Sequence, residues 1–148
     1  MDSSLDDLEI GEHREAELAA IVDYYGSGDD PVDPFGDVVR LRSYLRHGRL
    51  MVARVHGDFA GFLFYRITRS PWYDEAHGQV AIIDELHVMP LYRRRGVATS
   101  LMRKALREIG TKGVHRIYIE AATVPSLRLY KALGFKPIRV AYFLRRDL

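Results

Sequence analysis

Hydrophobic residues follow two spacings along this chain, and each spacing predicts a different kind of element. Between residues 97 and 109 apolar side chains recur every three or four positions, which marks the buried face of a helix. Between residues 79 and 88, and again between 114 and 121, apolar and β-branched residues form the short runs that are typical of strands. Segments of the two kinds alternate, so the pattern predicts a mixed α/β layer structure.

Turn-forming residues separate these segments and give the predicted order β-α-α-β-β-β-α-β-α-β(β). Strands are expected over residues 5–10, 50–55, 59–67, 79–88 and 114–121, with one or two closing strands within 135–144. Helices are expected over residues 13–25, 35–46, 97–109 and 125–133. Gly26 and Gly134 follow predicted helix ends, and Pro90 ends the strand before it. We expect one domain over residues 1–148, because no repeat or linker interrupts the chain.

The amino-acid composition agrees with a globular α/β domain and excludes several classes of function. The 148 residues are 47% hydrophobic and 28% charged, as in ordinary globular domains, and the net charge of +2 is too small to indicate nucleic-acid binding. There is no Cys, which excludes a disulfide framework and a thiol nucleophile, and the scattered His residues show no metal-ligand spacing. An acidic N-terminus, and the lack of an apolar run approaching about 20 residues, predict a soluble, cytoplasmic protein without a membrane segment.

The stretch from Asp84 to Ala98 brings carboxylates and arginines close together in the sequence. Asp84 and Glu85 lie on a predicted strand, and an arginine-rich turn then leads through Gly96 into a helix. The first N–H groups of a helix have no partner within the helix and carry a partial positive charge. Such a turn can therefore hold the phosphates of a cofactor beside an acid–base group.

Two motifs here resemble those of the GNAT N-acetyltransferases. Arg93-x-x-Gly96-x-Ala98 is similar to the family's cofactor signature, and Leu129-Tyr130-Lys131-Ala132-Leu133-Gly134-Phe135 resembles its tyrosine-bearing helix that closes on Gly-Phe. The resemblance implies a single N-acetyltransferase domain, with a mixed, mostly antiparallel central sheet flanked by about four helices. It also implies acetyl-CoA as the acyl donor and no metal, with a loose similarity to the polyamine-type acetyltransferases.

The resemblance further implies the residues that would hold acetyl-CoA. Backbone N–H groups at the helix start would meet the pyrophosphate, and the arginines would add charge. The implied contacts are Leu86, His87, Val88, Arg93, Arg94, Arg95, Gly96, Val97, Ala98, Thr99, Thr123, Ser126 and Tyr130. Thr123 and Ser126 depart from the family pattern, in which Asn and Ala are common at these positions.

Acetyl transfer to an amine needs a group that accepts the amine proton and benefits from one that protonates the leaving thiolate. For the acid, the resemblance implies the hydroxyl of Tyr130. For the base, Asp84 and Glu85 are both candidates, because a regular strand would point them to opposite faces and a bulge would change which one meets the substrate. For the carbonyl oxygen, the resemblance implies a backbone N–H near Val88.

The acceptor is the least defined part of the prediction. Aromatic residues that could line its site are Tyr24, Tyr25, Phe35, Trp72 and Tyr73. We expect a primary amine, with a small cationic amine ahead of a protein N-terminus or a lysine, and transfer without an acyl-enzyme on Cys. The alternative is a non-catalytic module that binds acyl-CoA and regulates a partner. No nucleic acid or membrane partner is expected, and the resemblance admits a homodimer.

Overall fold

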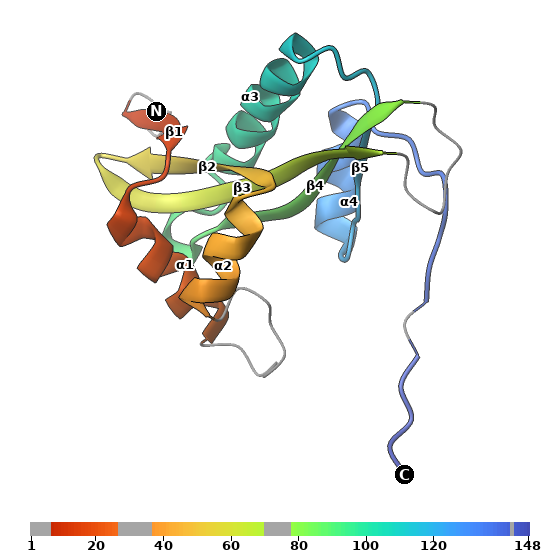
Figure 1. Cartoon of the computed structure of the whole chain (residues 1–148), viewed down its shortest axis with the longest axis horizontal. Helices are drawn as coiled ribbons and strands as arrows, with labels where there is room; N and C mark the ends of the chain where they lie inside the picture. Colours follow the sequence, from red (N-terminus) through yellow and green to blue (C-terminus); the bar gives the residue numbers. More distant parts are fainter. Residues whose placement is uncertain (1–6, 27–36, 70–77, 143) are drawn as a thin grey trace.

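A computed structural model describes residues 7–26, 37–69, 78–142 and 144–148 (Figure 1). The elements in chain order are β1 (Leu8–Glu12), α1 (Glu15–Gly26), α2 (Val38–Leu45), β2 (Gly48–Val55), β3 (Asp58–Arg69), β4 (Gln79–Val88), the 3₁₀ turn η1 (Pro90–Tyr92), α3 (Val97–Thr111), β5 (Ile117–Ile119) and α4 (Val124–Ala132). This order confirms the prediction as far as α4. None of the helices in the described ranges is long and apolar enough to cross a membrane.

The five strands form one sheet in the order β1-β2-β3-β4-β5. The first four strands pair antiparallel with their neighbours, and β5 pairs parallel to β4. The sheet is therefore mixed and mostly antiparallel, as expected. The closing strands predicted within 135–144 are not formed, since the described residues after α4 contain no strand and run away from the body of the molecule. Their sequence favours an extended backbone, but a strand also requires a neighbouring edge to pair with.

Helices cover both faces of the sheet. On one face α1 and α2 bury Leu18, Ile21 and Leu41 against side chains of β2 and β3. On the other face, the apolar stripe of α3, with Leu101 and Met102 fully buried, joins side chains of α4 and the sheet. Each face of the central strands therefore contacts a different pair of helices.

One irregularity in β4 determines which side chains each face receives. In the pairing of β3 with β4, Phe64 is opposite Glu85 and Tyr65 is opposite Ile83, so Asp84 is an extra residue and forms a bulge. β5 pairs with β4 only at residues 81–83, before the bulge. The last five residues of β4 thus extend past β5, and their backbone on that side of the strand does not pair with β5.

A buried ion pair joins α1 to the sheet. Arg54 on β2 is 2% exposed, and its guanidinium donates to both carboxylate oxygens of Glu17 at 2.6 and 2.5 Å and to the carbonyl of Glu12 at 2.7 Å. Burial alone would raise the pKa of Glu17, but hydrogen bonds from Arg54 and from the Arg14 backbone outweigh it and lower that pKa. The carboxylate therefore stays charged and holds the start of α1 on β2.

We predict that Arg54→Met lowers the free energy of unfolding by about 3 kcal/mol, because it leaves the Glu17 charge buried without its partner. Urea unfolding followed by circular dichroism measures the change. Arg42→Met is the matched control, since Arg42 pairs with Glu15 at an exposed position and its loss should cost no more than about 1 kcal/mol. Equal losses from both substitutions would contradict the structural role of the buried pair.

Candidate functional site

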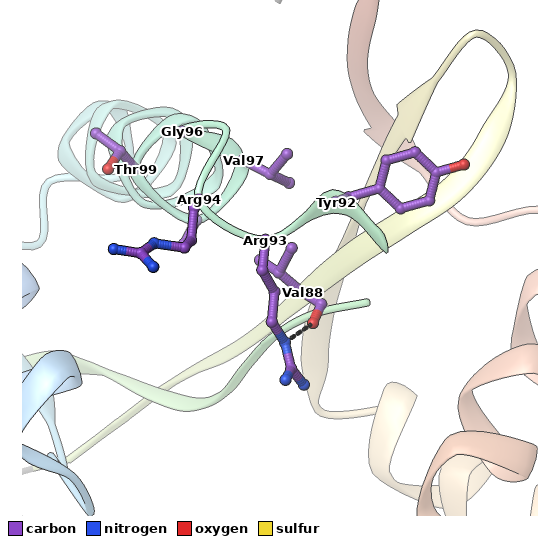
Figure 2. A pocket seen from close by; sticks show the side chains of 8 residues that line it. Val88, Tyr92, Arg93, Arg94, Gly96, Val97 and Thr99 are labelled. Atoms are coloured by element: carbon purple, nitrogen blue, oxygen red, sulfur yellow. Dashed lines mark hydrogen bonds between the residues drawn. The ribbon is translucent and has the colours of Figure 1, made fainter. Parts of the chain in front are cut away.

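The turn between β4 and α3 is held in an unusual backbone conformation. Arg94 and Gly96 have positive φ angles of 62° and 81°, a region that glycine adopts without strain and arginine rarely adopts. Arg93 anchors the turn, because its Nε donates to the carbonyl of Val88 at 3.0 Å (Figure 2). The arginine-rich turn is thus tied back to the end of β4.

A pocket opens where this turn enters α3. Its lining consists of Val88, Tyr92, Arg93, Arg94, Gly96, Val97, Ala98 and Thr99. Gly96 is the N-cap residue and offers no side chain to cap the first N–H groups of the helix. Those donors and the positive helix end therefore face an open pocket next to the guanidinium of Arg94, which is an arrangement suited to a phosphate group. Arg95, also predicted to contact the cofactor, lies over the ring of Tyr92, with 5.9 Å between its guanidinium carbon and the ring centroid.

The end of β4 lies close to β3 at Gly61. A Cβ atom at this position would lie 2.7 Å from the carbonyl oxygen of His87 and 3.3 Å from the Cα of Val88, so only glycine fits without a shift of β4. The absence of a side chain at Gly61 and the bond from Arg93 both fix the position of Val88. The resemblance implies that a backbone N–H near Val88 contacts the oxygen of the reacting carbonyl.

The two carboxylates of β4 have different partners. Asp84 forms an ion pair with Arg66 on β3, with 2.9 Å between Oδ2 and Nε, and it also meets Tyr44 on α2. Burial and then the hydrogen bond to Asp84 raise the pKa of Tyr44. Since Asp84 is held by these two side chains, it serves to fix α2 and β3 at the bulge.

Glu85 belongs to a chain of three side chains. His87 lies with Nε2 at 2.6 Å from Oε2 of Glu85 and with Nδ1 at 2.9 Å from the hydroxyl of Tyr24 on α1. An ionised carboxylate can only accept, so we assign the proton to Nε2 of His87, and Tyr24 then donates to Nδ1. Both ring nitrogens are engaged, which makes His87 a residue that orients Glu85. Among the described residues Oε1 of Glu85 has no hydrogen-bond partner, so this oxygen is open to a further donor.

Tyr130 approaches this group from α4. It is 7% exposed, packs against Phe135 at 6.1 Å between ring centroids, and belongs to the apolar cluster on the α3 face. Burial raises its pKa above the ordinary value of 10.0, and the negative charge of Glu85 raises it further. The hydroxyl therefore remains protonated at neutral pH, and it lies close enough to Glu85 for the charge of that carboxylate to disfavour ionisation of the phenol.

The remaining predicted residues divide into three groups. Leu86 and Val88 pack against the α3 cluster, so they follow the bulge onto the pocket side of β4. Thr123 and Ser126 form the capping box of α4, with their side chains bonded to each other's backbone N–H. Tyr25 is buried against Phe62 in the core under α1. The other acceptor candidates, Phe35, Trp72 and Tyr73, lie outside the described residues.

Arg66 and Tyr44 are the partners that sequence reasoning did not find. The sequence did hold a sign of the Arg66 partner. Arg66 is a charged residue within the predicted strand 59–67, and the next predicted strand carries Asp84. No comparable pattern marks Tyr44, whose position on Asp84 follows from how α2 packs on the sheet. These contacts distinguish the two carboxylates that the sequence left equivalent.

The site as a whole straddles β4. The phosphate-suited pocket, Leu86 and Val88 lie on the α3 side, while Glu85, His87 and Tyr24 lie on the α1 side. Tyr130 approaches the end of the strand from α4. Two substrates could therefore bind on opposite sides of one strand and meet near its end, between a carboxylate and a protonated phenol.

Comparison with known proteins shows which sequences and folds this chain resembles. The model of the acetyltransferase (GNAT) family matches residues 15–135 of the chain. A mycothiol acetyltransferase of Mycobacterium ulcerans (strain Agy99) is 38% identical over 73 residues, which cover 49% of this chain and 22% of that protein. An N-alpha-acetyltransferase of Sulfurisphaera tokodaii is 28% identical over 111 residues, which cover 70% of this chain and 64% of that protein. The chain thus spans about a fifth and just under two thirds of these curated relatives.

A solved structure shows the same fold over the whole length. The aminoglycoside N-acetyltransferase AAC(6')-Iy, bound to the bisubstrate analog CoA-S-monomethyl-acetylneamine, superposes with a TM-score of 0.75 at 22% identity. The match covers 95% of this chain and 99% of that one. The predicted α/β architecture is confirmed by this likeness.

Proposed function

This chain belongs to the acetyltransferase (GNAT) family, and on that basis we propose that it transfers the acetyl group of acetyl-CoA to the primary amine of a small cationic acceptor. The observation that carries the proposal is the position of the Glu85–His87–Tyr24 chain and of Tyr130 around the end of β4, next to the pocket at the start of α3. This arrangement supplies a base, an acid and an anion-binding pocket in one place.

The pocket at the start of α3 fits the pyrophosphate of acetyl-CoA. Backbone N–H groups of residues 97–99 and the guanidinium of Arg94 would hold it, and Gly96 keeps the approach to them clear of side chains. When bound there, acetyl-CoA supplies a thioester, which is the activated acyl group. The unpaired edge of β4 at Leu86 and Val88 leads from this pocket toward Glu85.

Glu85 is the base in this proposal. A free alkylamine has a pKa of about 10.4, so it arrives as an ammonium ion and must lose a proton before it can attack. Glu85 accepts that proton on Oε1, directly or through a water molecule, while His87 and Tyr24 hold the carboxylate in place. Asp84 is assigned no proton transfer, because its carboxylate is bound to Arg66 and Tyr44.

Tyr130 completes the proton balance. As the new C–N bond forms and the C–S bond breaks, Tyr130 gives its proton to the departing sulfur, and the resulting phenolate takes the second proton of the amine nitrogen. Because the pKa of Tyr130 is raised, its hydroxyl stays protonated across the neutral pH range and can act as the proton donor. In this proposal the transfer is direct, and the chain has no Cys that could carry an acyl group.

Two considerations favour a small cationic acceptor. The carboxylate of Glu85 is partly exposed on the α1 side, where it can attract an ammonium group. The relatives and the structural neighbour include acetyltransferases named for mycothiol and for aminoglycosides. A protein N-terminus is the second candidate acceptor, supported by the similarity to the N-alpha-acetyltransferase of Sulfurisphaera tokodaii.

A turnover screen tests the function. The purified chain of 148 residues is mixed with acetyl-CoA and, in turn, polyamines, amino acids, aminoglycosides and N-terminal peptides, and the released CoA thiol is measured. We expect release with at least one small cationic amine. Gly96→Glu is the control, because a carboxylate side chain in the pocket should abolish acetyl-CoA binding while the circular dichroism spectrum is kept. Tight binding of acetyl-CoA without turnover on any acceptor would instead support the non-catalytic acyl-CoA module.

We predict that Glu85→Gln and Asp84→Asn separate catalysis from stability. Glu85→Gln keeps a carbonyl oxygen for His87 but cannot accept a proton, so kcat at neutral pH should fall about 100-fold or more. Asp84→Asn should leave kcat within a few-fold and lower the free energy of unfolding by about 1–2 kcal/mol, because it weakens the pair with Arg66. Steady-state kinetics and urea unfolding measure the two effects. The reverse pattern would assign the base to Asp84.

We predict that Tyr130→Phe lowers kcat by about 100-fold with little change in acetyl-CoA affinity, because the ring still packs against Phe135 while the proton donor is lost. Calorimetric titration with acetyl-CoA and steady-state kinetics separate the two quantities. The pKa of Tyr130 lies above 10.0, so the wild-type enzyme should show no loss of activity from this group as the pH rises through 7 to 9. Unchanged turnover in Tyr130→Phe would remove the residue from the acid role.

A further inference from the structure

The charges of this chain are divided unevenly at the turn that opens the pocket. Residues 1–92 contain 8 basic residues (Lys or Arg) and 17 acidic residues (Asp or Glu), whereas residues 93–148 contain 14 and 3. The net charges of the two parts are therefore −9 and +11, and they nearly cancel in the overall value of +2. A separation of charge of this size favours an anionic ligand on the second part.

The fold turns this division of the sequence into a division of the surface. Helices α3 and α4 belong to the basic part and cover one face of the sheet, while α1 and α2 cover the other (Figure 1). Arg103 and Arg107 are exposed on α3, and Arg128 and Lys131 are exposed on α4. Within the described ranges, none of these four side chains forms a hydrogen bond or an ion pair with another residue. Their positive charges therefore face solvent.

Acidic side chains do little to offset this surface. Helix α3 contains one, Glu108, whose carboxylate accepts from Arg49 on β2 at 2.8 Å and from the hydroxyl of Tyr65 at 2.6 Å. Helix α4 contains none, and the other acid between residues 93 and 142 is Glu120, which follows β5. The positive charge on the outer sides of the two helices is thus not balanced locally.

The basic side chains of α3 form a line that begins at the pocket. Thr99 lines the pocket, and Arg103 and Arg107 follow it at intervals of four residues, so all three lie along one side of the helix. Since a helix rises 1.5 Å per residue, Arg103 lies roughly 6 Å and Arg107 roughly 12 Å along the axis from Thr99. These lengths are comparable with the distance of about 8 Å over which charges act in physiological salt. Both arginines are outside the pocket lining, yet their field reaches the pocket.

We propose that Arg103, Arg107, Arg128 and Lys131 form a capture surface that draws the acyl donor toward the pocket. Acetyl-CoA carries a pyrophosphate and a ribose phosphate, so it approaches as a polyanion. A field of positive charge around a binding site raises the rate at which such a ligand arrives, while the contacts within the pocket hold it once bound. The capture surface therefore raises the association rate constant, kon, and leaves the dissociation rate constant, koff, unchanged. This inference rests on acetyl-CoA as the donor and is independent of the acceptor and of the proton transfers.

Stopped-flow binding of etheno-CoA, a fluorescent analogue that keeps the phosphates of CoA, tests the proposal. In the variant Arg103→Gln/Arg107→Gln/Arg128→Gln/Lys131→Gln we expect kon to fall about 10-fold at low salt, with no change in koff. The difference in kon should disappear as NaCl is raised to about 1 M, where charges act over only about 3 Å. Glutamine is a good helix former, so the circular dichroism spectrum should be kept. Displacement of etheno-CoA by acetyl-CoA identifies the pocket as its site.

A matched pair of variants separates the capture surface from overall charge. Arg103→Gln/Arg107→Gln removes two charges from α3 and should lower kon a few-fold, whereas Arg40→Gln/Arg46→Gln removes two exposed charges from α2, on the other face, and should leave kon unchanged.

Three results would overturn the capture surface alone: an equal loss of kon in both double variants, a loss that persists in 1 M NaCl (a screening length of about 3 Å), or a rise in koff in place of a fall in kon. If neither etheno-CoA nor acetyl-CoA bound the wild-type chain, the donor itself would be overturned together with this proposal.

Discussion

The extra residue in β4 is the constraint on which the site depends. Without it, alternation along the strand would send Asp84 and Glu85 to opposite faces of the sheet. With it, both carboxylates lie on the side of α1 and α2, and the residues that follow return to a regular pattern in which Leu86 and Val88 face α3. The bulge also lies just after the last pairing of β4 with β5. One insertion thus places Asp84 and Glu85 on one side of the strand and the pocket on the other.

The charged groups of the molecule form separate sets with different purposes. Arg54 and Glu17 are buried and join α1 to the sheet, and Asp84 with Arg66 fixes the bulge against β3. On the α3 face, Glu108 accepts from Arg49 at 2.8 Å and from the hydroxyl of Tyr65 at 2.6 Å. Each of these carboxylates is matched by an arginine. Glu85 differs from them, because its described partner is an imidazole held by a phenol.

Much of this organisation could be predicted from the sequence because local patterns determine it. The strand at 79–88 has the predicted bounds, and the turn ending at Gly96 follows from the arginine run and the helix that begins after it. The choice between Asp84 and Glu85 could not be made, since a bulge is set by pairing with β3 and by Arg66 and Tyr44, which are distant in sequence. One or two closing strands were predicted within 135–144, and the described residues of this stretch contain no strand. In both cases the missing information concerned contacts across long sequence separations.

The hydrogen bond between Tyr24 and His87 joins two tasks that would otherwise be separate. Tyr24 belongs to α1, which covers the acceptor side in the proposed function, while His87 contacts the Glu85 carboxylate on β4. A change in α1 that admits a different acceptor would therefore also disturb the alignment of the base. The phenol on α1 thus limits how this fold can evolve: it ties substrate range to catalytic competence at a single position.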